Sequence, residues 1–93
     1  MTITVVLPRA LVPHARGAPT LALHGDHPTV RHLLDALAVE HPTLRDRLLT
    51  EQGALRPHVN VFVGEESVKY LDGLATSLRD GDTVVIAPAV SGG

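Results

Sequence analysis

TVRHLLDALAVEH, residues 29–41, is the stretch that decides the fold. Its apolar residues recur three or four positions apart, which is the spacing of one face of an α-helix; they are Val30, Leu33, Leu34, Leu37 and Ala38. Thr29 stands at the expected N-cap, where its hydroxyl can accept a backbone N–H of the first turn. Since a helix with one apolar stripe must bury that stripe against another layer, we predict one main helix covering one face of a sheet.

The predicted helix ends near His41 because Pro42 lacks a backbone N–H and disfavours helical geometry in the residue before it. Proline is also well suited to the first turn of a helix, so a second, short helix is expected to begin at Pro42. Its buried side would be formed by Leu44, Leu48 and Leu49.

Apolar residues alternate with period two on both sides of the helical region, which predicts strands. These segments are residues 1–7, 20–24, 58–63 and 83–88, with a shorter strand at 67–70. Residues 8–18 are expected to form a loop because they contain two prolines and a glycine. Residues 71–79 are expected to be irregular or to form one helical turn, and Asp80-Gly81-Asp82 to form a turn.

The element order predicts a two-layer α+β domain, in which a mixed sheet of about five strands carries the main helix on one face. Val6 makes the second face of the first strand partly apolar, which favours a central position in the sheet. We expect the first and last strands to be neighbours. The C-terminal residues would then leave from one end of the sheet.

Composition limits the classes of function. The chain has 93 residues, a net charge of -2 and no cysteine, so it is long enough for one domain, and thiolate ligands are excluded. The absence of a basic block argues against nucleic-acid binding. No long apolar segment or signal peptide is present, so no membrane contact and a cytoplasmic location are expected.

The six histidines raise the question of a metal site. His24, His27 and His32 are close in sequence, but their spacing matches no common zinc pattern, and solvated imidazoles are the favoured interpretation. The same is expected of His14 and His41 in loops, whereas His58 could be a half-buried structural residue. No nucleophile motif or phosphate-binding loop is found. We therefore predict no catalytic residue and no metal.

The C-terminus offers the remaining chemistry. Residues 1–88 are predicted to form the folded domain, and residues 89–93 to form a flexible tail ending in Gly92-Gly93. Five extended residues reach about 17 Å, and glycine lets the backbone enter a narrow channel. The α-carboxylate of Gly93 is a poor electrophile, so a partner must activate it. The alternative is an inert, frayed terminus or the start of a linker.

Residues 73–93, with their Asp-Gly-Asp turn, strand, Pro-x-Val segment and terminal Gly-Gly, resemble the ubiquitin-like sulfur carriers of the ThiS/MoaD family. Val59-Asn60-Val61 and Thr29-Val30 add to this resemblance, which implies the β-grasp fold. Pro13-His14 and residues 73–76 are most similar to the cysteine-biosynthesis carriers of actinobacteria. The β-grasp ferredoxins are excluded because their cluster needs cysteines.

The resemblance implies that Gly93 is adenylated by an E1-like enzyme with ATP and converted by a sulfur donor to a thiocarboxylate. Gly92, Ser91 and Val90 would enter the partner's channel. The outward face of the sheet supplies a candidate docking patch, formed by Phe62, Val85 and Ala87; ordinary surface apolarity is the alternative interpretation.

The resemblance also implies which partners and cofactors take part. A PLP-dependent cysteine synthase would accept the sulfur, and a metallopeptidase would release cysteine. The chain itself would bind no cofactor and be a monomer when free. The alternatives are the small subunit of molybdopterin synthase, a thiamin sulfur carrier, a ubiquitin-like modifier that forms isopeptide bonds through Gly93, and an interaction domain with an inert tail.

Overall fold

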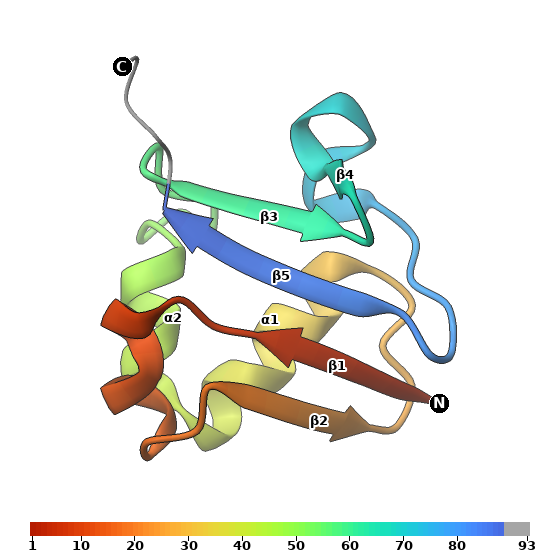
Figure 1. Cartoon of the computed structure of the whole chain (residues 1–93). Coiled ribbons are helices and arrows are strands. Elements are labelled where there is room, and N and C mark those ends of the chain that lie inside the picture. The colour runs from red at the N-terminus through yellow and green to blue at the C-terminus, as the bar shows by residue number, and fades with distance from the viewer. Residues whose placement is uncertain (89–93) are drawn as a thin grey trace.

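A computed structural model describes residues 1–88; residues 89–93 lie outside the described part of the chain. A mixed five-stranded sheet has the strand order β2-β1-β5-β3-β4 (Figure 1). Within residues 1–88, β1 and β5 are the only neighbouring strands that run parallel to each other. The strands are β1 (Thr2–Val6), β2 (Thr20–His24), β3 (Val59–Val63), β4 (Glu66–Ser67) and β5 (Thr83–Pro88). The predicted α+β fold with a mixed sheet is confirmed.

Two α-helices follow β2: α1 (Val30–Glu40) and α2 (Pro42–Leu48). The Oγ1 of Thr29 accepts the backbone N–H of His32 at 3.3 Å, which confirms the predicted N-cap. Pro42 opens α2, as expected. Within residues 1–88, neither these helices nor the shorter ones have the length and apolarity needed to cross a bilayer.

Strand β5 is central because it pairs with β1 on one side and with β3 on the other. The turn before it is tied to the start of β1: Thr2 N donates to Asp80 Oδ1 at 2.8 Å, and Gly81 N donates to Thr2 O at 2.8 Å. Gly81 has a φ of +86°, a conformation that glycine adopts without strain. The prediction that the first and last strands are neighbours in the sheet is therefore confirmed, and the Asp-Gly-Asp turn fixes their register.

The core is aliphatic and lies between α1 and one face of the sheet. Helix α1 contributes Val30, Leu33, Leu34 and Leu37, and the strands contribute Ile3, Val5, Val61, Val84 and Ile86, all at most 2% exposed. Burial of each such side chain contributes about 1.5–3 kcal/mol relative to an exposed one. Figure 1 shows α1 behind the strands, and no α-helix of residues 1–88 lies on the opposite face of the sheet.

The structure corrects two predicted segments. Residues 8–18 are not simply a loop, because they contain the 3₁₀ helix η1 (Arg9–Ala15) with Pro13 inside it. The predicted strand at 67–70 is confined to β4, after which the chain forms the 3₁₀ turn η2 (Val68–Tyr70). Ser67 causes this change, since its Oγ accepts Lys69 N at 3.4 Å and caps η2. The single helical turn expected within 71–79 is η3 (Gly73–Ala75).

Candidate functional site

The predicted tail begins where β5 ends. Pro88, the last described residue of β5, is exposed and pairs with Val59 of β3. The base of the tail is therefore held by a central strand of the sheet. The tail residues named above lie outside the described residues; they are Val90, Ser91, Gly92 and Gly93.

Strand β5 extends beyond its neighbour β1. The β1 ladder pairs with residues 83–85, whereas residues 86–88 are paired through β3 alone in the described part of the chain. The chain of β1 turns aside after Val6, and Leu7 N donates to Pro19 O at 2.9 Å. The space beside the end of β5 is occupied instead by η1, which leaves a hollow next to the base of the tail.

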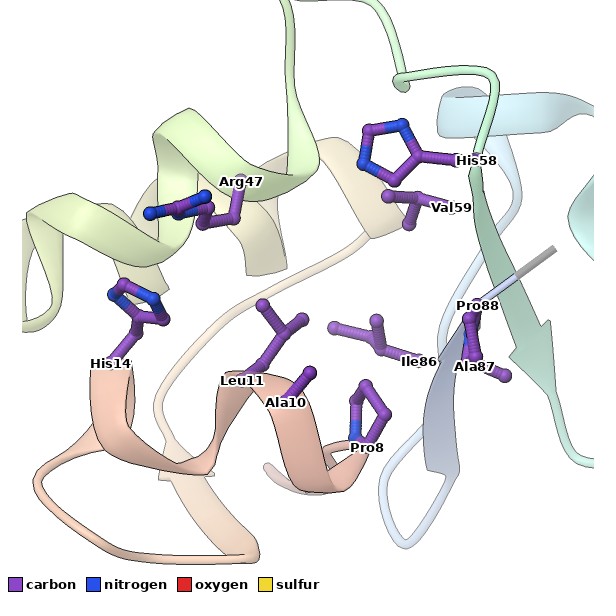
Figure 2. A pocket seen from close by; sticks show the side chains of 10 residues that line it. All are labelled: Pro8, Ala10, Leu11, His14, Arg47, His58, Val59, Ile86, Ala87 and Pro88. Carbon is purple, nitrogen blue, oxygen red and sulfur yellow. The ribbon is translucent and has the colours of Figure 1, made fainter.

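The hollow has a volume of about 240 Å³ and lies between η1, α2 and the adjoining ends of β3 and β5 (Figure 2). Leu11 and Ile86 point into it, with His14 and Arg47 on one side and Pro88 on the other. Sequence reasoning missed this feature. No short-range signal could have found it, because its walls come from four segments that are far apart in the chain.

The candidate docking patch lies on the open face of the sheet. Phe62 and Val85 are directly opposed in the β3–β5 ladder, and Ala87 follows Val85 on the same face. All three side chains are half-buried. Val6 of β1 is opposed to Val85 from the other side and extends the patch. The structure therefore brings the three predicted residues together, while their docking role stays a prediction.

Val6 was not predicted as part of this patch, although the sequence carried a signal for it. In residues 2–7 a strict alternation would place a polar residue at position 6, as Thr2 and Thr4 do on the same face. An apolar residue at such a position is typical of a strand with a partly apolar second face. The patch thus crosses three neighbouring strands.

His24, His27 and His32 each have a hydrogen-bond partner. His24 Nδ1 lies 3.0 Å from Thr2 Oγ1, and His32 Nδ1 lies 2.6 Å from Thr29 Oγ1. His27 Nε2 lies 3.3 Å from the carbonyl oxygen of His24. Within residues 1–88, no group of three potential ligand side chains is placed to hold a metal ion.

The expectations for two other histidines were wrong. His41 is only 8% exposed, not solvated, because it lies at the junction of α1 and α2. The backbone N–H of His41 donates to Leu37 O at 2.8 Å, and its backbone carbonyl oxygen accepts Leu44 N at 3.0 Å. His58 is exposed rather than half-buried, because it stands at the rim of the hollow just before β3 begins.

The comparisons with known proteins decide the family. The ThiS family profile matches residues 13–93. The sulfur carrier protein CysO of Mycobacterium tuberculosis (strain H37Rv) is 37% identical over 95 residues, covering 100% of both proteins. The chain belongs to the ThiS family. The family match extends to Gly93 and therefore covers the C-terminal Gly-Gly that the sequence singled out.

Two further relatives support this membership. Small archaeal modifier protein 3 of Haloferax volcanii is 46% identical over 68 residues, which is 73% of each protein. The crystal structure of the Amycolatopsis orientalis BexX/CysO complex contains a chain that matches with a TM-score of 0.84 and 34% identity, covering 98% of this chain and 99% of that one. The fold of this ThiS-family chain is thus the ubiquitin-like β-grasp.

These relatives are named as carriers and modifiers, not as enzymes. This ThiS-family protein is a small sulfur carrier, and the prediction of a carrier in place of an enzyme is confirmed. The function of such a carrier depends on the chemical modification that partner enzymes introduce into it. Its site therefore has two parts: the tail that would be modified and the surfaces around Pro88 that a partner can contact.

Proposed function

We propose that the protein carries sulfur as a thiocarboxylate on Gly93. In the first step the Gly93 carboxylate attacks the α-phosphate of ATP, forming an acyl-adenylate and releasing pyrophosphate. In the second step a sulfur donor replaces AMP at the carbonyl carbon, which leaves –COS⁻ on the chain. Both steps take place in an E1-like enzyme, and this chain contributes the reacting group and the surface that is recognised.

Activation is necessary for an elementary reason. An α-carboxyl group has an ordinary pKa of about 3.5, so it is ionised at neutral pH. The resulting anion repels nucleophiles and offers no good leaving group. Adenylation removes the negative charge from the carbonyl and supplies AMP as the leaving group, after which sulfur can attack.

One observation carries this proposal: the similarity to sulfur carriers extends along the whole chain and includes its last residues. The 37% identity to CysO covers 100% of both proteins, and the family match ends at Gly93. The position of Pro88 supports the same function, because an exposed end of a central strand can present the following residues to a partner.

Cysteine formation is the pathway that we propose for the sulfur. The support is the full-length similarity to CysO together with the residues that resemble the cysteine-biosynthesis carriers. The acceptor would be an aminoacrylate on a PLP-dependent synthase, and a metallopeptidase would afterwards release cysteine and restore Gly93. The cytoplasm is the proposed location, since ATP and PLP enzymes operate there. The BexX/CysO complex supports the idea that such a carrier assembles with a partner protein.

The experiment is intact-mass spectrometry after incubation with the cognate E1-like enzyme, ATP and a sulfur source. We expect a mass gain equal to the replacement of one oxygen by sulfur, which requires ATP. An unchanged mass with an enzyme that activates other carriers would contradict the proposal. Adding the PLP-dependent synthase and O-phosphoserine or O-acetylserine should then return the carrier to its original mass plus one cysteine residue.

A second candidate function is protein modification, in which Gly93 forms an isopeptide bond with lysines of other proteins. The observation in its favour is the 46% identity to a protein named as a small archaeal modifier. Affinity-tagged carrier should be recovered from its own cells under denaturing conditions. Lysine-linked adducts that vanish when Gly93 is deleted would support modification, and recovery of the unconjugated carrier alone would exclude it.

A further inference from the structure

The hollow beside Pro88 carries a charge that differs from that of the chain as a whole. It shares His14, Arg47 and His58 with a second depression of about 460 Å³, which is lined by side chains from η1, α2 and the segment before β3. The charged and titratable residues around the two are His14, Arg47, Arg56, His58 and Asp46. The lining of the two depressions therefore includes two arginines and one carboxylate, whereas the net charge of the whole chain is -2. We refer to the hollow with these residues as the basic hollow.

The rim of the basic hollow is partly fixed in place. His14 Nδ1 lies 3.0 Å from Thr43 Oγ1, which ties η1 to α2. Arg56 Nε donates to the carbonyl oxygen of Asp46 at 2.7 Å, which holds that guanidinium against the end of α2. Arg47 is exposed on α2, and Figure 2 shows its guanidinium on the side of the hollow where His14 lies. The guanidinium of Arg56 is therefore preorganised, and a preorganised charge loses less conformational freedom when a partner binds it.

The floor of the basic hollow is apolar. It is formed by Pro8, Ala10, Leu11 and the end of β5. Leu11 is partly buried and packs against the core, so it belongs to the folded body. Apolar floors with a polar rim are the arrangement that protein interfaces use for a single anchoring side chain.

We propose that the basic hollow receives an acidic segment of the adenylating enzyme, with one apolar side chain on the floor and a carboxylate against Arg47. Continuity is the first reason, because Pro88 is both a wall of the hollow and the base of the tail. A protein that takes up the tail must cover its base. Charge complementarity is the second reason, since the rim is positive. The proposal rests on the proposed function and adds the surface through which the enzyme recognises this carrier.

The test is ATP–pyrophosphate exchange catalysed by the cognate E1-like enzyme, measured against carrier concentration. Arg47→Glu should lower kcat/KM about tenfold, mainly by raising KM, because a rim charge acts on association. Arg47→Lys should keep most of the wild-type value. Raising the salt concentration should lower kcat/KM for the wild-type protein and have a smaller effect on Arg47→Glu.

Arg79→Glu is the matched control, since it makes the same change in net charge. Arg79 is exposed and precedes the start of β5, at the other end of that strand from Pro88. A second variant, Ala10→Phe, fills the hollow from an exposed position and should raise KM without a charge change. Denaturant unfolding of each variant should show that the domain remains folded.

Equal kcat/KM values for Arg47→Glu and Arg79→Glu would overturn the proposal. A faster Arg47→Glu variant would also overturn it, because it would indicate that residues 89–93 of this chain occupy the hollow and compete with the enzyme. Dimers of the free carrier that dissociate in Arg47→Glu would assign the hollow to a second copy instead. If the wild-type protein supports no ATP–pyrophosphate exchange, both the proposed function and this proposal fail. If exchange occurs and the variants have wild-type kcat/KM values, only this proposal fails.

Discussion

The inner and outer faces of β5 carry similar apolar residues but differ in burial. Val84 and Ile86 on the inner face are 0% and 2% exposed. Val85 and Ala87 on the outer face are only half-buried, and no described helix covers them. Because side chains alternate along a strand, adjacent residues of one short segment belong to the core and to the surface in turn.

This difference separates stability from recognition. The inner face binds β5 to α1 and so fixes the direction in which the chain leaves the domain at Pro88. The outer face contributes less to folding and stays available for a partner. Substitutions on the two faces should therefore have opposite signatures: loss of stability from the inner face, and loss of activation at unchanged stability from the outer face.

The largest loss of stability is expected from Ile86→Ala. The change removes buried methyl groups and leaves a cavity under the inner face of the sheet, which should lower the free energy of unfolding by about 3 kcal/mol. Urea unfolding monitored by circular dichroism measures this effect. A loss below about 1 kcal/mol would show that the inner face does not hold β5 in the way described.

The same substitution at two adjacent residues gives the sharpest comparison. Val84→Thr places a hydroxyl in the core and should cost about 2 kcal/mol. Val85→Thr places the same hydroxyl on the half-buried face and should change the free energy of unfolding by about 0.5 kcal/mol or less. Val85→Thr should instead lower kcat/KM of adenylation severalfold.

Equal losses of stability from Val84→Thr and Val85→Thr would show that the two faces of β5 do not differ in their contribution to folding. Unchanged adenylation of Val85→Thr, with Phe62→Ala also active as wild type, would mean that the patch is ordinary surface. The exchange assay described for the basic hollow serves for both variants.

A smaller effect is expected from the turn that leads into β5. Asp80→Ala removes the acceptor of Thr2 N, which should lower the free energy of unfolding by about 1 kcal/mol. Glu65→Ala, in another turn, removes the same charge from an exposed side chain. Chemical unfolding of the two variants in parallel measures the difference, and identical stability would show that the turn does not anchor β5.

The regular elements could be predicted because their residues carry a periodic pattern. The stripe in α1, the cap at Thr29 and the alternation in β3 depend on neighbours within a few positions. The pairing of β1 with β5 was also accessible, since both strands are apolar on two faces. Helix η1 was not accessible, because a 3₁₀ turn has no distinctive apolar period and Pro13 resembles a loop residue.

Only half of the candidate site could be predicted from the sequence, for a similar reason. Gly92-Gly93 and the outer patch follow from local sequence. The basic hollow depends on Leu11, Arg47 and Ile86 meeting in space, which only the tertiary structure arranges. The burial of His41 likewise follows from the way α1 and α2 pack, not from any residue beside it.

The central claim is that the folded body presents Gly93 for conversion to a thiocarboxylate. The chain has no cysteine, so a maleimide added after reaction with the E1-like enzyme, ATP and a sulfur source reports the thiocarboxylate alone. Trypsin then releases residues 80–93 as one peptide, since no lysine or arginine follows Arg79. We expect this peptide to carry the label on Gly93.

Deletion of Gly92 and Gly93 provides the control for the same measurement. The shortened protein should keep the wild-type free energy of unfolding within about 0.5 kcal/mol, because the deletion lies beyond β5, and it should take up no label. A label on residues 1–79, or none on the wild-type protein, would contradict the account. So would labelling of the shortened chain.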